Sequence, residues 1–288
     1  EVSLNGKKLA EHHCGYTAFT VDLTDELRFG EDNLLEVKVD SRENQNVPPF
    51  GFVIDYMTFG GIYRDVYLEV RNKEHIADAF LVSKDVDVLA GKAVLESQIS
   101  LSVDDFTDGK YELSQKLDGE EIVHAAVSNK SFTVVSDLMD VDLWDVDSPT
   151  LYHVKTELIK DGQVIDSTDT RFGFRKIDFK ADGFYLNDRK VKLRGLNRHQ
   201  SYPYVGYAMP ESMQRYDADI LKNELGCNAV RTSHYPQSHY FIDRCDELGL
   251  LVFMEFPGWQ YIGDAEWKEQ AVANVHEMVE QYRNHPSI

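Results

Sequence analysis

Three short apolar segments near the end of the chain each run directly into polar or aromatic side chains. These side chains are His199, His234, Glu255 and Trp259. Two imidazoles and a carboxylate can exchange hydrogen bonds with hydroxyl groups, and an indole offers a flat apolar surface to the C–H face of a sugar ring. Any one of these residues alone is an ordinary loop residue. Their combination at neighbouring positions predicts a pocket that binds a carbohydrate.

Strand and helix patterns alternate over residues 181–288 and would bring these side chains together. Strands are predicted at 191–197, 227–232 and 250–255, and helices at about 210–226, 237–248 and 264–285. Asp264 is expected to cap the third helix and Gly249 to end the second, and helical spacing places Tyr216, Val275 and Val279 on the buried stripes of their helices. Three consecutive βα units indicate a parallel sheet covered by helices, in which reactive residues gather past the carboxyl ends of the strands. The periodicity fits a closed (β/α)8 barrel and an open doubly wound sheet equally well.

The sequence lacks the motifs of dinucleotide-binding, acyl-transfer and calcium-binding sites. No GxGxxG follows a predicted strand, which argues against a dinucleotide site, and the Ser233-His234 pair lacks the nucleophile elbow of acyl-transfer enzymes. The aspartates between positions 137 and 147 lack the glycine and terminal glutamate of an EF-hand, so they are expected to form a solvated face. We therefore expect neither a cofactor nor a bound metal.

Two all-β regions precede the βα units. In residues 1–72, strands are predicted near 1–4, 18–23, 34–39 and 62–70. These strands suit an antiparallel sandwich but are too few to close one, so part of this domain is expected upstream of Glu1. Residues 73–180 continue the β pattern with Asp-Gly pairs at 108–109, 118–119 and 161–162, which favour type I′ hairpin turns. This second region is predicted to be an immunoglobulin-like sandwich.

Composition limits the partners. The 288 residues are 42% apolar and carry a formal net charge of −20, which disfavours nucleic acid and anionic membranes. No apolar run is long enough to cross a bilayer. The three cysteines are widely spaced and are expected to be reduced. The first residues resemble the interior of a longer polypeptide without a secretion signal, so the compartment cannot be read here, and a cytoplasmic location is favoured.

Several longer motifs resemble glycoside hydrolase family 2, which contains β-galactosidases, β-glucuronidases and β-mannosidases. They are Gly15–Phe19, Gly60–Val66, Gly173–Arg175, Arg194–His199, Asn228–Pro236, Cys245–Leu250 and Tyr282–Ile288. The resemblance covers essentially the whole chain in the domain order of the family. It implies the end of a jelly-roll sugar-binding domain in residues 1–72, an immunoglobulin-like β-sandwich in 73–180, and the first part of a TIM barrel in 181–288.

The resemblance implies a retaining β-glycosidase, in which one glutamate protonates the glycosidic oxygen and a second attacks the anomeric carbon. In the family, the acid/base glutamate lies in an Asn-Glu pair shortly after the motif that ends here at Ile288, and the nucleophile lies further on. The chain is therefore expected to be a piece of the enzyme that is inactive by itself. Its partner would be a carbohydrate substrate, and self-association into a homo-oligomer stays open.

The family's sugar contacts map onto several matching positions. His199 and His234 resemble the histidines that bind the sugar at the cleaved bond, and Asp55 resembles a jelly-roll aspartate that reaches the same sugar. Asn197, Arg231 and Glu255 are expected to support these contacts. For Arg231 it stays open whether the side chain ties the strand end to a carboxylate or touches the ligand. The alternative for Asp55 is a loop-capping carboxylate.

Trp259 marks a departure from the family. Many large β-galactosidases have a Glu-Thr-His segment that helps to bind Mg²⁺ where this chain has Trp259-Gln260-Tyr261. We expect a wall on which the sugar stacks in place of this metal site, with core packing as the alternative role of Trp259.

Three functions stay open at this level. The segment 194–200 favours a β-galactosidase over a β-glucuronidase or another β-glycosidase of the family. A carbohydrate-binding protein that has lost the catalytic glutamates is the alternative of a different class. An Asn-Glu pair encoded shortly after Ile288 would favour the enzyme.

Overall fold

Two antiparallel sheets form the middle of the chain. The structure, a computed structural model, describes residues 1–51, 54 and 56–288. One sheet has the order β4-β5-β8, with bounds His75–Asp87, Lys92–Ser102 and Ser131–Leu138. The other has the order β10-β9-β6-β7, with bounds Gln163–Phe172, Tyr152–Lys160, Tyr111–Leu117 and Glu120–Val127. Ile99 and Leu101 of the first sheet share a buried core with Leu113 and Leu158 of the second, so the sheets pack face to face.

Two of the three predicted Asp-Gly turns are confirmed. Asp118-Gly119 joins β6 to β7 and Asp161-Gly162 joins β9 to β10, with positive φ at all four residues as a type I′ turn requires. The prediction is wrong for Asp108-Gly109. This pair lies in the longer connection from β5 to β6, which belong to different sheets, so no hairpin can form there.

The N-terminal region contains a small antiparallel sheet of order β2-β1-β3. Its strands are Lys7–Ala10, Val2–Leu4 and Leu35–Val37, and a short 3₁₀ helix, η1, spans Thr24–Glu26. The predicted strands at 18–23 and 62–70 are wrong, because the structure has no strand at either place. Val66, Leu68 and Val70 are exposed. Alternation alone does not make a strand, because the backbone groups also need a neighbouring strand with which to pair.

A parallel sheet of order β14-β15-β16 forms the last part of the chain. Its strands are Gly195–Arg198, Ala229–Thr232 and Leu251–Met254, and an antiparallel meander of β11 (Ile177–Lys180), β12 (Gly183–Leu186) and β13 (Arg189–Val191) precedes it. The first predicted parallel strand began too early, since Val191 belongs to β13. The parallel strand begins at Gly195, where an added Cβ would lie 1.9 Å from the Ala229 carbonyl oxygen. Only glycine permits this close approach of the two strands.

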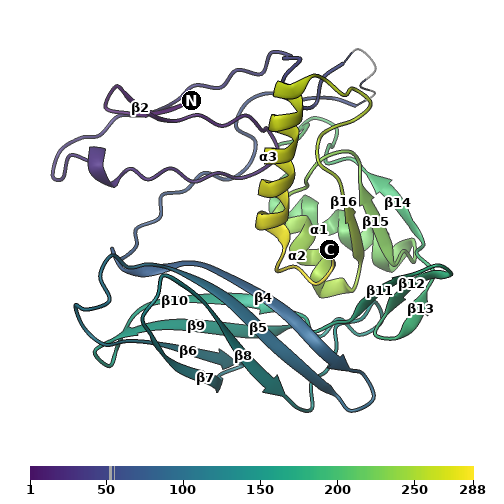
Figure 1. The fold of residues 1–288 in the computed structure, drawn as a ribbon. Coiled ribbons are helices and arrows are strands. Elements are labelled where there is room, and N and C mark those ends of the chain that lie inside the picture. The colour runs from purple at the N-terminus through teal and green to yellow at the C-terminus, as the bar shows by residue number, and fades with distance from the viewer. Residues whose placement is uncertain (52–53, 55) are drawn as a thin grey trace.

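Helices cover one face of this sheet. They are α1 (Glu211–Asp219) with its π-helical continuation η2 (Ile220–Glu224), α2 (His239–Leu248) and α3 (Ala265–Tyr282). The buried residues of this core include Ala218, Leu221, Val230, Phe241 and Ile242. On the opposite face Phe253 is 68% exposed. The sheet is therefore covered by α1 and α2 on one side (Figure 1). On the other side Leu251 packs against the β11–β13 meander, and the sheet is exposed at Phe253.

The predicted helix ends are mostly confirmed, whereas the predicted buried faces of the helices are partly wrong. Asp264 accepts hydrogen bonds from the backbone of Glu266 and Trp267 and so caps α3, and Gly249 ends α2 with a φ of 68°. Val275 and Val279, however, are exposed although helical spacing placed them on the buried stripe of α3. Tyr216 of the first helix is likewise exposed.

The last residues of the chain join the parallel sheet to β4 of the first antiparallel sheet. The Asn284 side-chain amide donates to the Ala79 carbonyl at 2.9 Å and accepts from the Leu81 backbone N–H at 3.0 Å. It therefore pairs with the backbone of β4 as a residue of a neighbouring strand would. The Val252 N–H donates to the Ser287 carbonyl at 2.7 Å, which aligns the chain end with β16. The N-terminal region lies along α3 in turn, where the Ala18 N–H donates to Gln281 at 2.9 Å (Figure 1).

Candidate active site

Three of the predicted side chains form one aromatic group past the ends of the parallel strands. The ring centroids of His199 and His234 are 5.4 Å apart, and those of His234 and Trp259 are 4.1 Å apart. His199 and Trp259 are half-buried, whereas His234 is only 8% exposed. The structure therefore brings these three side chains together, as predicted.

Glu255 anchors one of the two histidines. Its carboxylate accepts a hydrogen bond from Arg231 and lies 2.8 Å from Nδ1 of His234. The Glu255 backbone N–H donates to the Thr232 hydroxyl at 3.2 Å, which ties the end of β16 to the end of β15. Since Nδ1 of His234 is engaged in this way, Nε2 is the nitrogen available to a ligand.

The positive charge of Arg231 is paired with a carboxylate of the same site. The sequence left open whether Arg231 contacts a ligand or holds a carboxylate, and in the structure it forms an ion pair with Glu255. Asn197 lies beside Arg231 in the register of β14 and β15, and its side chain is exposed. Asp55, the expected contact from the N-terminal region, lies outside the described residues.

Tyr56 belongs to the same group. Its ring lies 5.6 Å from His199, 5.7 Å from His234 and, edge to face, 6.0 Å from Trp259. A segment far away in the sequence therefore supplies one wall of the site. Sequence reasoning missed this residue, although it follows Asp55 directly.

Arg198 holds the strand end from which His199 projects. This arginine is 6% exposed and bonds Asp217 at 2.7 Å, Gln214 at 2.8 Å and Gln237 at 2.5 Å. Its guanidinium carbon lies 3.9 Å from the ring centroid of Phe241. Burial lowers the pKa of Arg198, and the carboxylate of Asp217 acts in the opposite direction. Arg198 thus connects β14 to α1 and to the loop before α2, a role that the sequence did not reveal.

A cluster of tyrosines packs the N-terminal region against this end of the sheet. Tyr16, Tyr207 and Tyr235 are buried together, and the rings of Tyr16 and Tyr235 stack with centroids 4.6 Å apart. Tyr63 packs against them and donates to the Gly15 carbonyl. Burial raises the pKa of Tyr63 to about 12, so its phenol keeps the proton that it donates.

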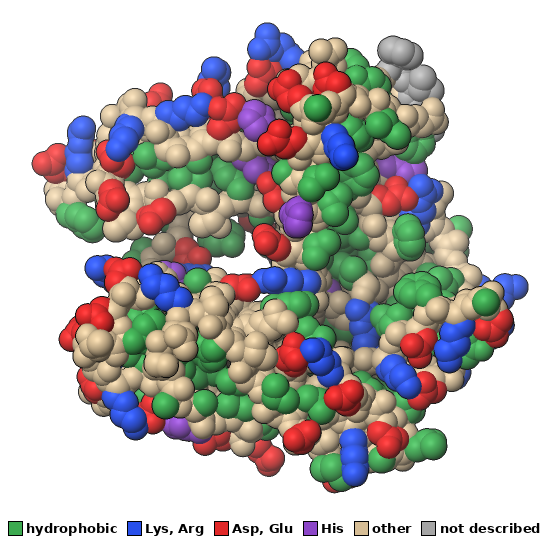
Figure 2. Space-filling view, viewed as in Figure 1, with side chains coloured by type: hydrophobic (Ala, Val, Ile, Leu, Met, Phe, Trp, Pro, Cys, Tyr) green, Lys and Arg blue, Asp and Glu red, His purple; other side chains and the backbone are tan. Residues whose placement is uncertain are grey.

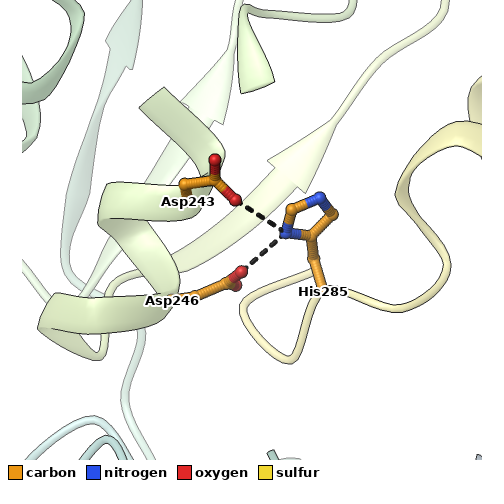
Figure 3. A group of neighbouring side chains, drawn as sticks. All are labelled: Asp243, Asp246 and His285. Atoms are coloured by element: carbon orange, nitrogen blue, oxygen red, sulfur yellow. Dashed lines mark hydrogen bonds and ion pairs between the residues drawn. The ribbon is translucent and has the colours of Figure 1, made fainter. Parts of the chain in front are cut away.

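A separate group of potential metal ligands lies on α2 and in the segment after α3. Nδ1 of His285 is 2.6 Å from Asp246 and 4.0 Å from Asp243 (Figure 3). Asp243 also forms an ion pair with Arg171, and Asp246 accepts from the Ser287 N–H at 3.0 Å. A guanidinium at this place opposes a metal cation, so the group serves as a bridge between α2, the chain end and β10.

No disulfide links Cys14, Cys227 and Cys245 to one another. Burial raises the pKa of Cys245 and of Cys14, so both thiols stay protonated at neutral pH. Acidic and basic side chains are mixed over the visible surface (Figure 2). None of the described helices is long and apolar enough to span a membrane.

Two family models match most of the chain. Residues 74–175 match the model for glycosyl hydrolases family 2, and residues 177–288 match the model for the TIM barrel domain of that family. The chain belongs to glycosyl hydrolase family 2. The parallel sheet therefore belongs to a TIM barrel domain, which decides between the two architectures that the sequence left open.

Relatives and solved structures agree with this assignment. The chain is 46% identical to a β-galactosidase of Thermoanaerobacter pseudethanolicus over 100% of its own length and 39% of the relative's. It is 31% identical to a β-glucuronidase of Bacteroides fragilis, of which it covers 44%. The crystal structure of Bacteroides uniformis β-glucuronidase superposes with a TM-score of 0.90 at 30% identity, and the chain covers 36% of it. The chain spans about two fifths of the curated β-galactosidases that it matches.

Proposed function

We propose that this chain is part of a retaining β-glycosidase whose sugar pocket is formed in part by His199, His234, Trp259 and Tyr56. The observation that carries the proposal is the anchored imidazole of His234, which is held by Glu255 within an aromatic wall in a glycosyl hydrolase family 2 barrel. A histidine fixed at Nδ1 offers Nε2 to a sugar hydroxyl in one orientation. Trp259 and Tyr56 supply the flat surfaces against which a pyranose ring packs.

These residues act on the transition state in the proposed mechanism. As the sugar ring flattens toward an oxocarbenium ion, the bonds from its hydroxyls to His199 and His234 shorten and strengthen. The general acid and the nucleophile are two glutamates in the part of the protein after Ile288. Glu255 does not transfer the proton, because its carboxylate is already committed to Arg231 and His234.

The finer domain assignments belong to this proposal. Residues 1–72 are assigned to the end of a jelly-roll domain that brings Asp55 to the sugar, and residues 73–180 to an immunoglobulin-like sandwich. Residues 181–288 are assigned to the first βα units of the barrel. The face-to-face packing of two antiparallel sheets and the contacts of Tyr56 with the barrel support these assignments.

A neutral galactoside is the proposed substrate. The 46% identity to a β-galactosidase supports it, as does the ion pair of Arg231. The guanidinium of Arg231, which could bind the carboxylate of a glucuronide, forms an ion pair with Glu255 instead. β-Glucuronidase is the second candidate, supported by the relatives and solved structures of that name.

The test compares the full-length protein on nitrophenyl β-galactoside, β-glucuronide and β-mannoside. We expect the highest kcat/KM on the galactoside and no turnover by the 288-residue chain, which lacks the two glutamates of the mechanism. A preference for the glucuronide would replace the substrate assignment. Galactose binding to the full-length protein without turnover of any glycoside would instead indicate a carbohydrate-binding protein.

A further inference from the structure

Arg64 of the N-terminal region contacts both loops that carry the histidines of the site. Its Nη2 donates to the Pro236 carbonyl at 2.7 Å and to the Gln200 side-chain oxygen at 3.2 Å. Its Nη1 donates to the Tyr16 carbonyl. Pro236 is two residues after His234, so one guanidinium connects the His234 loop to the loop after β14.

Gln200 transmits this contact to the other histidine. It directly follows His199 in the chain and is completely buried. Its side-chain oxygen also accepts from the Ser238 N–H at 2.6 Å, and its own N–H donates to the Tyr235 hydroxyl at 3.1 Å. The position of Gln200, and with it that of His199, is therefore fixed by the loop after β15 and by Arg64 together.

The chemistry of these bonds suits a positioning role. All three acceptors of Arg64 are neutral carbonyl oxygens, so the guanidinium serves as a rigid planar donor. Without it the Pro236 carbonyl loses this donor, and Gln200 keeps its bonds to the His234 loop only. The two loops could then shift relative to the N-terminal region that also supplies Tyr56.

We infer that Arg64 is a positioning residue that sets the spacing and orientation of His199 and His234 for glycoside hydrolysis. The kinetic part of this inference rests on the proposed function. Arg64 does not belong to the aromatic group of the proposed sugar pocket, and it acts on the sugar through the two histidine loops.

Asp65 provides a matched control. It is adjacent to Arg64 and also bridges the N-terminal region to the barrel, because its carboxylate accepts from the Tyr240 hydroxyl at 2.8 Å. This bond is exposed and lies on α2, apart from the histidine loops. Asp65→Asn therefore weakens the same interface without touching Gln200 or Pro236.

The experiment compares Arg64→Met, Arg64→Lys and Asp65→Asn in the full-length protein, with kinetics corrected for the folded fraction. A misplacement of about 1 Å can cost about 100-fold in rate, so Arg64→Met should lower kcat/KM by about 10- to 100-fold, mainly in kcat. Arg64→Lys should recover part of this loss, because an ammonium can still reach one of the carbonyls. Asp65→Asn should leave the kinetics unchanged.

Crystal structures of the same proteins provide a readout that does not depend on turnover. In Arg64→Met, the separation of the His199 and His234 rings should depart from 5.4 Å, whereas in Asp65→Asn it should not. Wild-type ring separation in both variants, or wild-type kinetics of folded Arg64→Met, would overturn the inference. If Arg64→Met does not fold, wild-type kcat/KM in Arg64→Lys would overturn it equally. Failure of the wild-type protein to hydrolyse any glycoside would reject the proposed function, and the ring separation would still test Arg64.

Discussion

Replacing Glu255 with glutamine tests how the anchored imidazole contributes to the reaction. The substitution keeps the shape of the side chain but removes the charge that holds Arg231 and Nδ1 of His234. The backbone bond from residue 255 to the Thr232 hydroxyl is unaffected, so the end of β16 should stay in place. We expect a folded protein in which the imidazole of His234 is less well oriented.

The expected size of the effect follows from the burial of the pair. The side chains of His234 and Glu255 are 10% and 20% exposed, so solvent screens their interaction only partly. A hydrogen bond to a charged group contributes about 1.5–3 kcal/mol. If this contribution is lost in the transition state, kcat/KM falls by about 10- to 150-fold.

A double-mutant cycle identifies the route of this effect. His234→Ala should cost about 30- to 1000-fold in kcat/KM, which corresponds to about 2–4 kcal/mol of transition-state stabilisation. If Glu255 acts through His234, Glu255→Gln should add little to His234→Ala in the double variant. The assay is hydrolysis of the preferred nitrophenyl glycoside by the full-length protein, with the melting temperature as the measure of folding. Additive losses, or unchanged kinetics with a lowered melting temperature, would refute the reasoning.

Two further predictions concern the junction between the parallel sheet and the two antiparallel sheets. Asn284→Ala removes both bonds to β4 and should lower the free energy of unfolding by about 1–3 kcal/mol in denaturant titrations, whereas Asn223→Ala on the exposed end of the first helix should have little effect. Burial lowers the pKa of His285, but the hydrogen bond to Asp246 and the nearby Asp243 outweigh burial and the repulsion from Arg171, so the net pKa is raised above 6.5. The contribution of the His285–Asp246 pair to the stability of the fold should therefore be complete below about pH 6.5 and disappear as the pH rises through the raised pKa. In His285→Gln, the melting temperature should change less over this pH range. A wild-type profile in that variant would contradict the assignment.

The local backbone conformation of this protein can largely be predicted from its sequence. The turns at Asp118-Gly119 and Asp161-Gly162, the cap at Asp264 and the end of α2 at Gly249 all follow from residues that favour one backbone geometry. The grouping of His199, His234 and Glu255 was also predictable, because parallel strands in register place their carboxyl ends together. The rules behind these predictions act over a few residues or between neighbouring strands.

Contacts between segments that are distant in the sequence determined the features that could not be predicted. The alternating segment 62–70 is not a strand, because pairing depends on a partner that alternation does not specify. The side chains of Val275 and Val279 follow helical spacing, but only the packing of neighbours around α3 determines which of its faces is buried. Arg64 reaches the Pro236 carbonyl across 172 positions of sequence. Such a contact exists only once the N-terminal region has packed its tyrosines against the barrel, since no local pattern specifies how two surfaces that are distant in the sequence meet.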